Sequence, residues 1–361
     1  MRAISRLALL ALIGSTHAQE VAPENGDPAA VVIESAQSFV PAAVIDRSAP
    51  VYPGTELIRG REAWVEVDFC IDESGNPQNI VVLDGTGSEE FERAAVKAVR
   101  KWRFEPARAD GKPTWQSNNQ HLIRFAIDQN LRASSQRTKR QYHKLRNLID
   151  NGDLQEADKL FRQLIDSDQL NLYETAKFWV QRVRYEAKVG DFPRMDLALH
   201  RATASGGEWI DKPSYRELLA LRVKVALKIA DYTGALSAYR KLTDVSGEDS
   251  PPVAELQPIV EELRTLVASD AVLGTPAEIR AKGGCYGCDD SYFFTPVRRQ
   301  IALSDIAGDL RSLSIRCDNR RFESEISEDV EWHMPESWGT CSVQIYGEPG
   351  TTFTIRTLPD A

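Results

Sequence analysis

The 361-residue sequence lacks a long apolar run and an excess of positive charge. A membrane-spanning helix needs about 20 consecutive apolar residues, and no segment of this sequence is long and apolar enough to span. The formal net charge is -9, which argues against nucleic acid as a main partner, because binding to phosphates requires a basic surface. Neither an integral membrane protein nor a nucleic-acid-binding protein is therefore expected.

The residue patterns of enzymes are also missing. The histidines beyond the first twenty residues are His121, His143, His200 and His333, and their spacing matches no metal site. They accompany no serine or cysteine nucleophile motif, and no Gly-rich phosphate loop or pair of catalytic carboxylates stands out. We therefore predict a protein without enzymatic activity, metal or cofactor.

Residues 1–18 have the composition of a secretory signal peptide. Arg2 and Arg6 precede the short apolar stretch from Leu7 to Gly14, and residues 16–18 end in a small side chain. An uncleaved anchor is the alternative, but the apolar stretch is far shorter than a span. Cleavage would leave residues 19–42 as a flexible leader and would place the mature chain in the periplasm.

Cysteine is scarce, and four of the five cysteines lie in the last quarter of the chain. Cys70 lies within a strand pattern, whereas the other four are Cys285, Cys288, Cys317 and Cys341. Because an oxidising compartment favours disulfides, we predict that these four form structural bridges. The first two also have the spacing of a thiol-disulfide oxidoreductase, but the acidic residues that follow them oppose thiolate formation. A four-cysteine zinc site is the third reading, and the same compartment disfavours it.

Residues 43–128 have the pattern of a small α+β domain. Two strands are expected over residues 64–72 and 79–84, separated by the turn sequence Ser-Gly-Asn-Pro. Apolar residues at helical spacing follow from Phe91 to Trp102. A third strand is expected over residues 120–127. In it, one face carries His121, Ile123, Phe125 and Ile127, and the other carries Gln120, Leu122, Arg124 and Ala126. The predicted order is strand, strand, helix, strand.

This unit resembles the carboxy-terminal domain of the TonB energy-transducer family. The matching residues, in the order and spacing of that family, are Pro50-Val51-Tyr52-Pro53, Gly60, Trp64-Val65, Phe69, Ile71-Asp72, Gly75, Phe91, Ala94-Ala95, Trp102-Arg103-Phe104, Pro106-Ala107 and Asp110-Gly111-Lys112-Pro113. The resemblance implies a periplasmic domain that grips outer-membrane transporters, with Tyr52 and Pro53 near the contacting surface. It also implies that an extended peptide pairs beside the last strand, along Gln120, Leu122, Arg124 and Ala126. The alternative for that edge is that the leader or the helical unit caps it. The alternative for Tyr52 and Pro53 is a rigid turn, with Tyr52 packed on the sheet.

Residues 131–270 are predicted to be helical. A turn made of a small residue, Asp and an apolar residue recurs around Asp153, Asp191 and Asp231, at spacings of 38 and 40 residues. Helical-pair repeats have periods of about 34 to 47 residues, so we interpret this region as three tetratricopeptide-like pairs.

Residues 283–361 are predicted to form a small β-sandwich or barrel. Short strand patterns cover residues 300–303, 313–317, 322–326, 340–346 and 352–357. A bridge between Cys317 and Cys341 would join two of these strands.

The sequence thus predicts an α+β multidomain periplasmic adaptor that binds envelope proteins by strand addition. One alternative is a component of TonB-dependent outer-membrane transport that acts on a receptor. Since the sequence shows neither the anchor nor the long Pro-rich spacer of energy transducers, that role would need an anchor on another protein. A thiol-disulfide oxidoreductase using Cys285 and Cys288 is a further alternative. The open edge of the sheet could also pair two copies of the chain as a homodimer.

Overall fold

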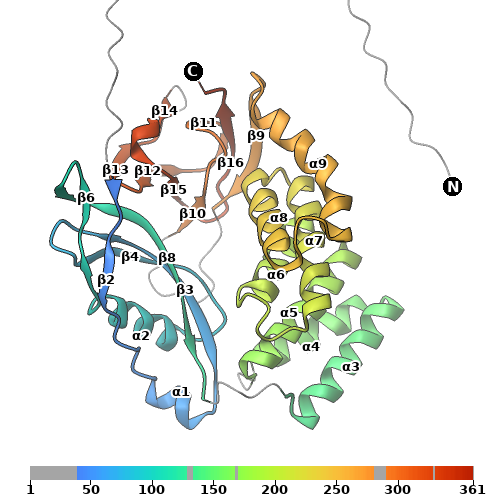
Figure 1. The fold of residues 1–361 in the computed structure, drawn as a ribbon. Helices are drawn as coiled ribbons and strands as arrows, with labels where there is room; N and C mark the ends of the chain where they lie inside the picture. Colours follow the sequence, from blue (N-terminus) through green and yellow to red (C-terminus); the bar gives the residue numbers. More distant parts are fainter. Residues whose placement is uncertain (1–38, 128–132, 167–169, 280–289, 328–329, 361) are drawn as a thin grey trace, which may run out of the picture. The chain divides into compact units, whose positions relative to one another are not determined.

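The fold is α+β in the computed structural model, which describes residues 39–127, 133–166, 170–279, 290–327 and 330–360 (Figure 1). The predicted signal peptide, most of the predicted leader, Cys285 and Cys288 lie outside these ranges. Within them, no helix combines the length and the apolarity that crossing a membrane requires.

A three-stranded antiparallel sheet and one helix form the first folded part, in the predicted order. The central strand β3 (Ala63–Ile71) lies between β4 (Pro77–Gly85) and β8 (Gln116–Phe125). Helix α2 (Glu89–Val99) covers one face of this sheet (Figure 1). Their shared core is almost fully buried and includes Val65, Val67, Phe69, Ile71, Phe91, Val99, Trp102, Phe104, Ile123 and Phe125.

The turn between β3 and β4 depends on a glycine. Asp72 Oδ1 accepts the backbone N–H groups of Ser74 (2.9 Å) and Asn76 (2.8 Å), which closes the turn. Gly75 has φ of +80°, and a Cβ atom there would lie 1.8 Å from the carbonyl oxygen of Phe104. Only glycine fits this position, because both the backbone conformation and the close approach exclude a side chain.

Several short elements surround this sheet that the sequence patterns did not predict. They are β1 (Phe39–Val40), β2 (Ala43–Asp46), α1 (Gly54–Ile58), β5 (Arg103–Glu105), β6 (Ala107–Ala109) and β7 (Lys112–Thr114). Strand β2 pairs with β5, and β6 pairs with both β1 and β7. Each is too short to leave a periodic pattern in the sequence.

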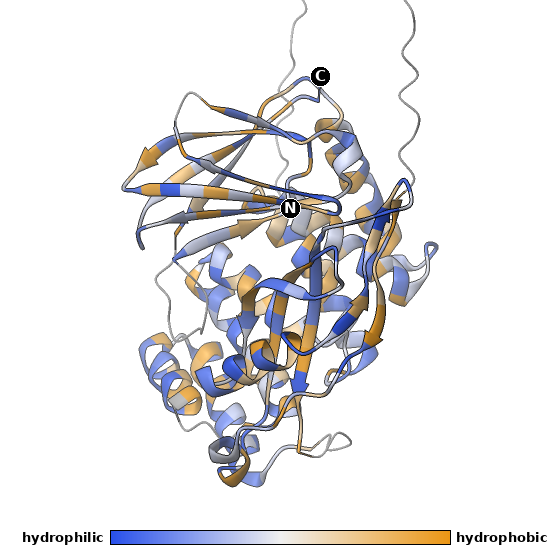
Figure 2. Cartoon of the chain, turned by 90° about the vertical axis from the view of Figure 1, so that its left-hand side faces the viewer, coloured by the Kyte–Doolittle hydropathy of each residue, from blue (hydrophilic) through white to orange (hydrophobic). Residues whose placement is uncertain are grey.

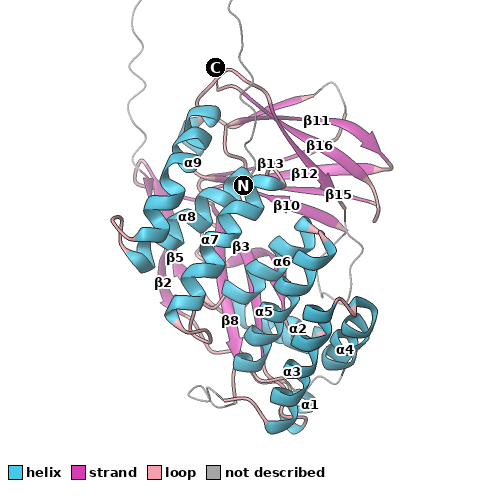
Figure 3. Ribbon diagram, turned by 90° about the vertical axis from the view of Figure 1, so that its right-hand side faces the viewer, coloured by secondary structure: helices cyan, strands magenta, loops and turns pink. Residues whose placement is uncertain are grey.

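The middle of the chain is helical, as predicted. The helices are α3 (Gln136–Asn151), α4 (Leu154–Asp166), α5 (Leu172–Val189), α6 (Phe192–Thr203), α7 (Lys212–Lys228), α8 (Tyr232–Ser246) and α9 (Pro251–Val267), drawn together in Figure 3. Helices α3 and α5 end at Gly152 and Gly190, which both have positive φ. Ala230, in the turn between α7 and α8, also has positive φ. Asp191 and Asp231 then cap the next helices through their side chains. The helix boundaries therefore fall at the predicted turns.

The last part consists of two four-stranded sheets around one apolar core. One sheet has the order β10 (Ser291–Phe294), β15 (Cys341–Gly347), β12 (Leu310–Cys317), β13 (Arg320–Glu325). The other has the order β14 (Glu331–His333), β11 (Gln300–Ala307), β16 (Thr352–Leu358), β9 (Leu273–Glu278). The alternating hydropathy of the strands is visible in Figure 2. Strand β9 lies before residue 283, so this β-rich part begins earlier in the chain than the sequence pattern indicated.

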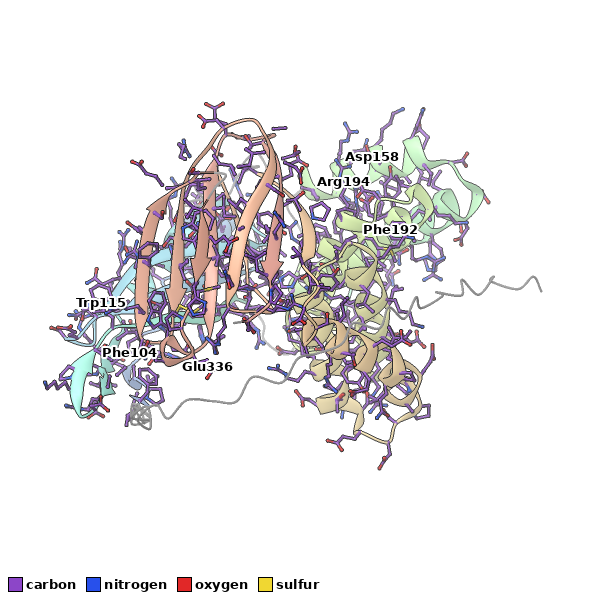
Figure 4. The ribbon with its side chains drawn as sticks, turned by 90° about the horizontal axis from the view of Figure 1, so that it is seen from above. Phe104, Trp115, Asp158, Phe192, Arg194 and Glu336 are labelled. Atoms are coloured by element: carbon purple, nitrogen blue, oxygen red, sulfur yellow. A yellow bond between two sulfur atoms is a disulfide. The ribbon has the colours of Figure 1, made fainter. Side chains whose placement is uncertain are left out.

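A disulfide joins the neighbouring strands β12 and β15. Cys317 and Cys341 are paired across the ladder with a Cα–Cα distance of 3.9 Å, and they form a disulfide (Figure 4). Both residues belong to the core between the two sheets. The predicted bridge between these two cysteines is therefore present.

Candidate peptide-binding edge

The central strand β3 fixes the direction in which the backbone of β8 faces. Trp64 in β3 turns both backbone groups toward the β4 side, because its carbonyl accepts from Thr86 N–H (3.1 Å) and its N–H donates to Thr86 Oγ1 (3.2 Å). In an antiparallel ladder, successive residues face opposite neighbours. Ala63 and Val65 therefore face β8, where their partners are Phe125 and Ile123.

The alternate residues of β8 consequently direct their backbone groups away from β3. These residues are Gln120, Leu122 and Arg124, and the same alternation reaches Ala126 just after the strand. Among the described residues, the backbone groups of Gln120, Leu122 and Arg124 have no hydrogen-bonding partner. We call this row of outward N–H and C=O groups the β8 edge. An unpaired row of this kind is a template for pairing with an extended peptide.

The start of β8 is closed by another part of the chain. The backbone N–H of Ser117 donates to the carbonyl of Asp318 at the turn between β12 and β13 (3.3 Å). A bulge separates this contact from the β8 edge, since the register shifts beside Asn118, which has φ of +61°. From Gln120 onward, the outward groups have no partner in the part of the chain that the structure describes.

The side chains of the β8 edge lie against the helical part. Leu122 and Ala126 are partly buried and pack on the apolar core formed by α5 to α9. Arg124 forms an ion pair with Glu208, which lies between α6 and α7 (2.9 Å). Gln120 lines a cavity of about 1450 Å³. The structure thus brings the four predicted residues together on one edge, and their role in binding a peptide stays a prediction.

The other face of β8 belongs to the domain core. His121 lies edge-on to Trp102, with 5.1 Å between ring centroids. Burial lowers the pKa of His121, and the positive charges of Arg47 and Arg124 lower it further. The imidazole is therefore held in its neutral form more strongly than a histidine in water.

Tyr52 and Pro53, the residues implied to contact a transporter, lie beside the same core. The Tyr52 ring packs edge-on to Phe91 (5.6 Å) and Phe125 (5.8 Å). Burial, with the carboxylates of Glu62 and Glu56, raises the pKa of Tyr52 to about 12, so its hydroxyl stays protonated and donates to the Arg61 carbonyl. Pro53 immediately precedes α1. These contacts give Tyr52 a packing role, and its contact with a transporter stays a prediction.

Ionic contacts that the sequence did not predict join this sheet to the rest of the chain. Asp68 on β3 pairs with Arg316 on β12 at 3.1 Å, and both side chains are at most 2% exposed. The carboxylate of Asp84 on β4 accepts hydrogen bonds from Nε and Nη2 of Arg201 on α6. The shortest of them joins Nη2 to Oδ1 at 2.6 Å. The two oxygens of Glu62 accept the backbone N–H groups of Ile127 (2.7 Å) and Leu172 (2.9 Å).

These contacts bury the second face of β3 as well as the first. Trp64 belongs to the apolar core of the helical part and is only 2% exposed. Cys70, on the same face, is a buried free thiol in contact with Ser117 Oγ (3.3 Å). Burial raises the pKa of the Cys70 thiol, so it stays protonated and unreactive. Cys285 and Cys288 lie outside the described residues, so their predicted bridges are not tested.

Comparison with known proteins assigns the first folded part. Residues 48–127 match the family described as Gram-negative bacterial TonB protein C-terminal. Protein TonB of Yersinia enterocolitica is 38% identical over 88 residues, which cover 24% of this chain and 34% of that protein. Protein TonB of Pseudomonas aeruginosa is 43% identical over 63 residues, or 18% of each chain. The chain therefore spans about a third or less of the length of these relatives.

Solved structures match parts of the chain. The solution structure of the Pseudomonas aeruginosa TonB CTD is 31% identical and covers 28% of this chain and 95% of its own, with a TM-score of 0.23. PcrH from Pseudomonas aeruginosa is 15% identical and covers 38% of this chain and 99% of its own, with a TM-score of 0.28. The sequence matches carry the assignment. Over residues 48–127, the chain contains a Gram-negative bacterial TonB protein C-terminal domain.

Proposed function

We propose that this protein is a non-enzymatic, protein-binding adaptor of TonB-dependent outer-membrane transport. Its TonB C-terminal domain captures an extended peptide of an envelope protein, such as an outer-membrane receptor, along the β8 edge. The observation that carries the proposal is the outward row of backbone groups at Gln120, Leu122 and Arg124, which have no partner within the described ranges of the chain. Main-chain hydrogen bonds to such a row supply affinity, and side chains beside it select the sequence.

The rest of the chain would contribute to this selection. Side chains of the captured peptide would alternate between the two faces of the sheet. Those on the face of Leu122 and Arg124 would meet the helical part, where Glu208 already pairs with Arg124. We propose that the helices over residues 131–270 act as tetratricopeptide-like pairs that extend the contact surface. Helical repeats commonly present extended binding surfaces.

The proposal includes the periplasmic setting predicted from the sequence. Residues 1–18 would be removed as a signal peptide, and residues 19–42 would form a leader before the TonB C-terminal domain at 43–128. The β-rich part would complete the adaptor, with its disulfide suited to an oxidising compartment.

A crosslinking experiment in cells tests the capture of a peptide. A photo-crosslinking amino acid in place of Arg124 should capture a segment of an outer-membrane receptor. The same group in place of Lys97, which is exposed on α2, serves as the control position. Capture of the protein itself would mean that the edge pairs two copies as a homodimer. Capture of nothing, or equal capture from both positions, would contradict peptide binding at the β8 edge.

A backbone substitution separates strand addition from side-chain contact. Arg124→Pro removes one outward N–H group and no hydrogen bond to β3, whereas Arg124→Ala removes only the side chain. With the crosslinker in place of Gln120, Arg124→Pro should reduce capture relative to Arg124→Ala. Equal capture by the two variants would contradict pairing through the backbone.

A further inference from the structure

Among the strands that the structure describes, β10 forms a second sheet edge, in the β-rich part. Asp290, just before β10, directs its carbonyl toward β15, where it accepts the N–H of Gly347 (3.1 Å). By alternation, Tyr292 and Phe294 also face β15, and Ser291 and Phe293 direct their backbone groups outward. The backbone groups of Ser291 and Phe293 have no hydrogen-bonding partner among the described residues. We call this row the β10 edge.

The side chain of Phe293 lies on the opposite face from the sandwich core. Tyr292 and Phe294 pack on that core and Phe293 does not, although all three residues are half-buried and line the 1450 Å³ cavity. Its cross-strand neighbour Gln344 also lines the cavity. Gln344 is 2% exposed, and its Oε1 atom has no hydrogen-bonding partner among the described residues. The cavity wall beside the β10 edge therefore offers a buried acceptor to which no described residue donates.

The cavity has an excess of negative charge. Its described lining contains nine Asp and Glu side chains and four Lys and Arg side chains. The acids are Glu56, Glu62, Glu66, Asp84, Glu92, Asp196, Asp231, Glu278 and Asp305, and the bases are Arg61, Arg201, Arg222 and Lys241. All three arginines already pair with lining acids, namely Glu56, Asp84 and Asp196. The excess acid and the free acceptor together favour a ligand that is cationic and rich in donors.

We infer that the β10 edge and this acidic cavity bind an extended, arginine- or lysine-rich segment of another protein. The segment adds a strand beside β10, with its backbone paired to Ser291 and Phe293. Its cationic side chains face the cavity, where Glu278 on β9 and Asp305 on β11 are exposed. The Phe293 ring offers a face on which a guanidinium group stacks. The β10 edge belongs to a different sheet from the β8 edge, although Gln120 of the β8 edge lines the same cavity. The inference does not depend on the proposed function.

The test measures binding of a fluorescein-labelled peptide of alternating arginine and valine to the full mature chain. A matched peptide with glutamate in place of arginine is the ligand control. The arginine peptide should bind, and its affinity should fall with added salt because the attraction is screened. The glutamate peptide should not bind. Equal binding of the two peptides would overturn the inference.

Charge-removing variants test the cavity. Glu278→Gln with Asp305→Asn should weaken binding of the arginine peptide several-fold at low salt. The exposed acids Glu248 and Asp249 lie outside the described lining of the cavity, so Glu248→Gln with Asp249→Asn is the matched control. All four positions are exposed, so both variants should keep the fold. An affinity that the first pair of substitutions leaves unchanged would overturn the inference.

A backbone variant tests the β10 edge. Phe293→Pro should bind about 2- to 10-fold more weakly than Phe293→Ala, the effect expected for one lost hydrogen bond. Both variants lack the ring, and neither loses a bond to β15. Arg124→Pro should leave binding of the arginine peptide unchanged. Loss of binding in Arg124→Pro would place the peptide at the β8 edge and overturn the inference.

Discussion

The ion pair between Asp68 and Arg316 gives a quantitative test of how the TonB C-terminal domain is held. The two charges lie 3.1 Å apart and are almost fully buried. At an effective dielectric constant of about 20, their attraction is about 5 kcal/mol. Removing each ion from water costs several kcal/mol, so the intact pair contributes little net stability. Asp68 Oδ1 and Arg316 Nε also have no hydrogen-bonding partner among the described residues.

Removal of one partner should have a much larger effect than removal of both. Asp68→Leu leaves the Arg316 guanidinium buried without a counter-charge, which should lower the free energy of unfolding by about 3–5 kcal/mol. The double variant Asp68→Leu with Arg316→Met replaces the pair with apolar side chains and should recover most of that loss.

Urea unfolding followed by tryptophan fluorescence measures these differences, with Arg316→Met alone completing the cycle. We expect both single variants to be less stable than the double variant. Single variants that each stay within about 1 kcal/mol of the wild type would refute the reasoning, because such values are typical of exposed pairs. In that case the sheet would not be held against β12 in solution.

Three further predictions concern stability. Replacing Cys317 and Cys341 by alanine removes a disulfide between residues 24 positions apart and should lower the free energy of unfolding by about 3 kcal/mol. Urea unfolding with and without reductant measures this difference. The folded pKa of His121 lies below its ordinary value of 6.5, so the unfolded chain binds more protons below that pH. Stability should therefore fall as pH is lowered through 6.5, and His121→Asn should reduce this slope. Gly75→Ala should lower the melting temperature far more than Gly111→Ala, because both glycines have positive φ but only Gly75 closely approaches another strand. Equal shifts for the two glycine variants would contradict the close approach.

Local patterns in the sequence predicted the helices and strands that are long enough to show a periodic arrangement of apolar residues. Alternation predicted β3 and β8, and helical spacing predicted α2 and the helices that end near Gly152 and Gly190. Short elements such as β2 and β10 have too few residues to alternate visibly. Their positions depend on partners elsewhere in the chain, and β2 pairs with β5 about sixty residues away.

The sequence identified the residues of the β8 edge but not what lies beside them. Leu122 and Arg124 were expected to face away from the domain core, and they do. That they meet the helical part and Glu208 follows from tertiary packing, which leaves no local signal. The pair of Asp68 and Arg316 spans 248 residues of sequence. The acidic residues Glu66 and Asp68 within a mainly apolar strand are a local hint of such partners.

Amide hydrogen exchange on the β8 edge tests the central claim most directly. The measurement compares the exchange rates of the Leu122 and Arg124 N–H groups with and without the receptor segment captured from position 124. The proposal predicts that both outward amides become protected by the bound segment, while the inward Ile123 amide, already bonded to β3, changes little. Binding of the segment without added protection of Leu122 and Arg124 would contradict strand addition at this edge.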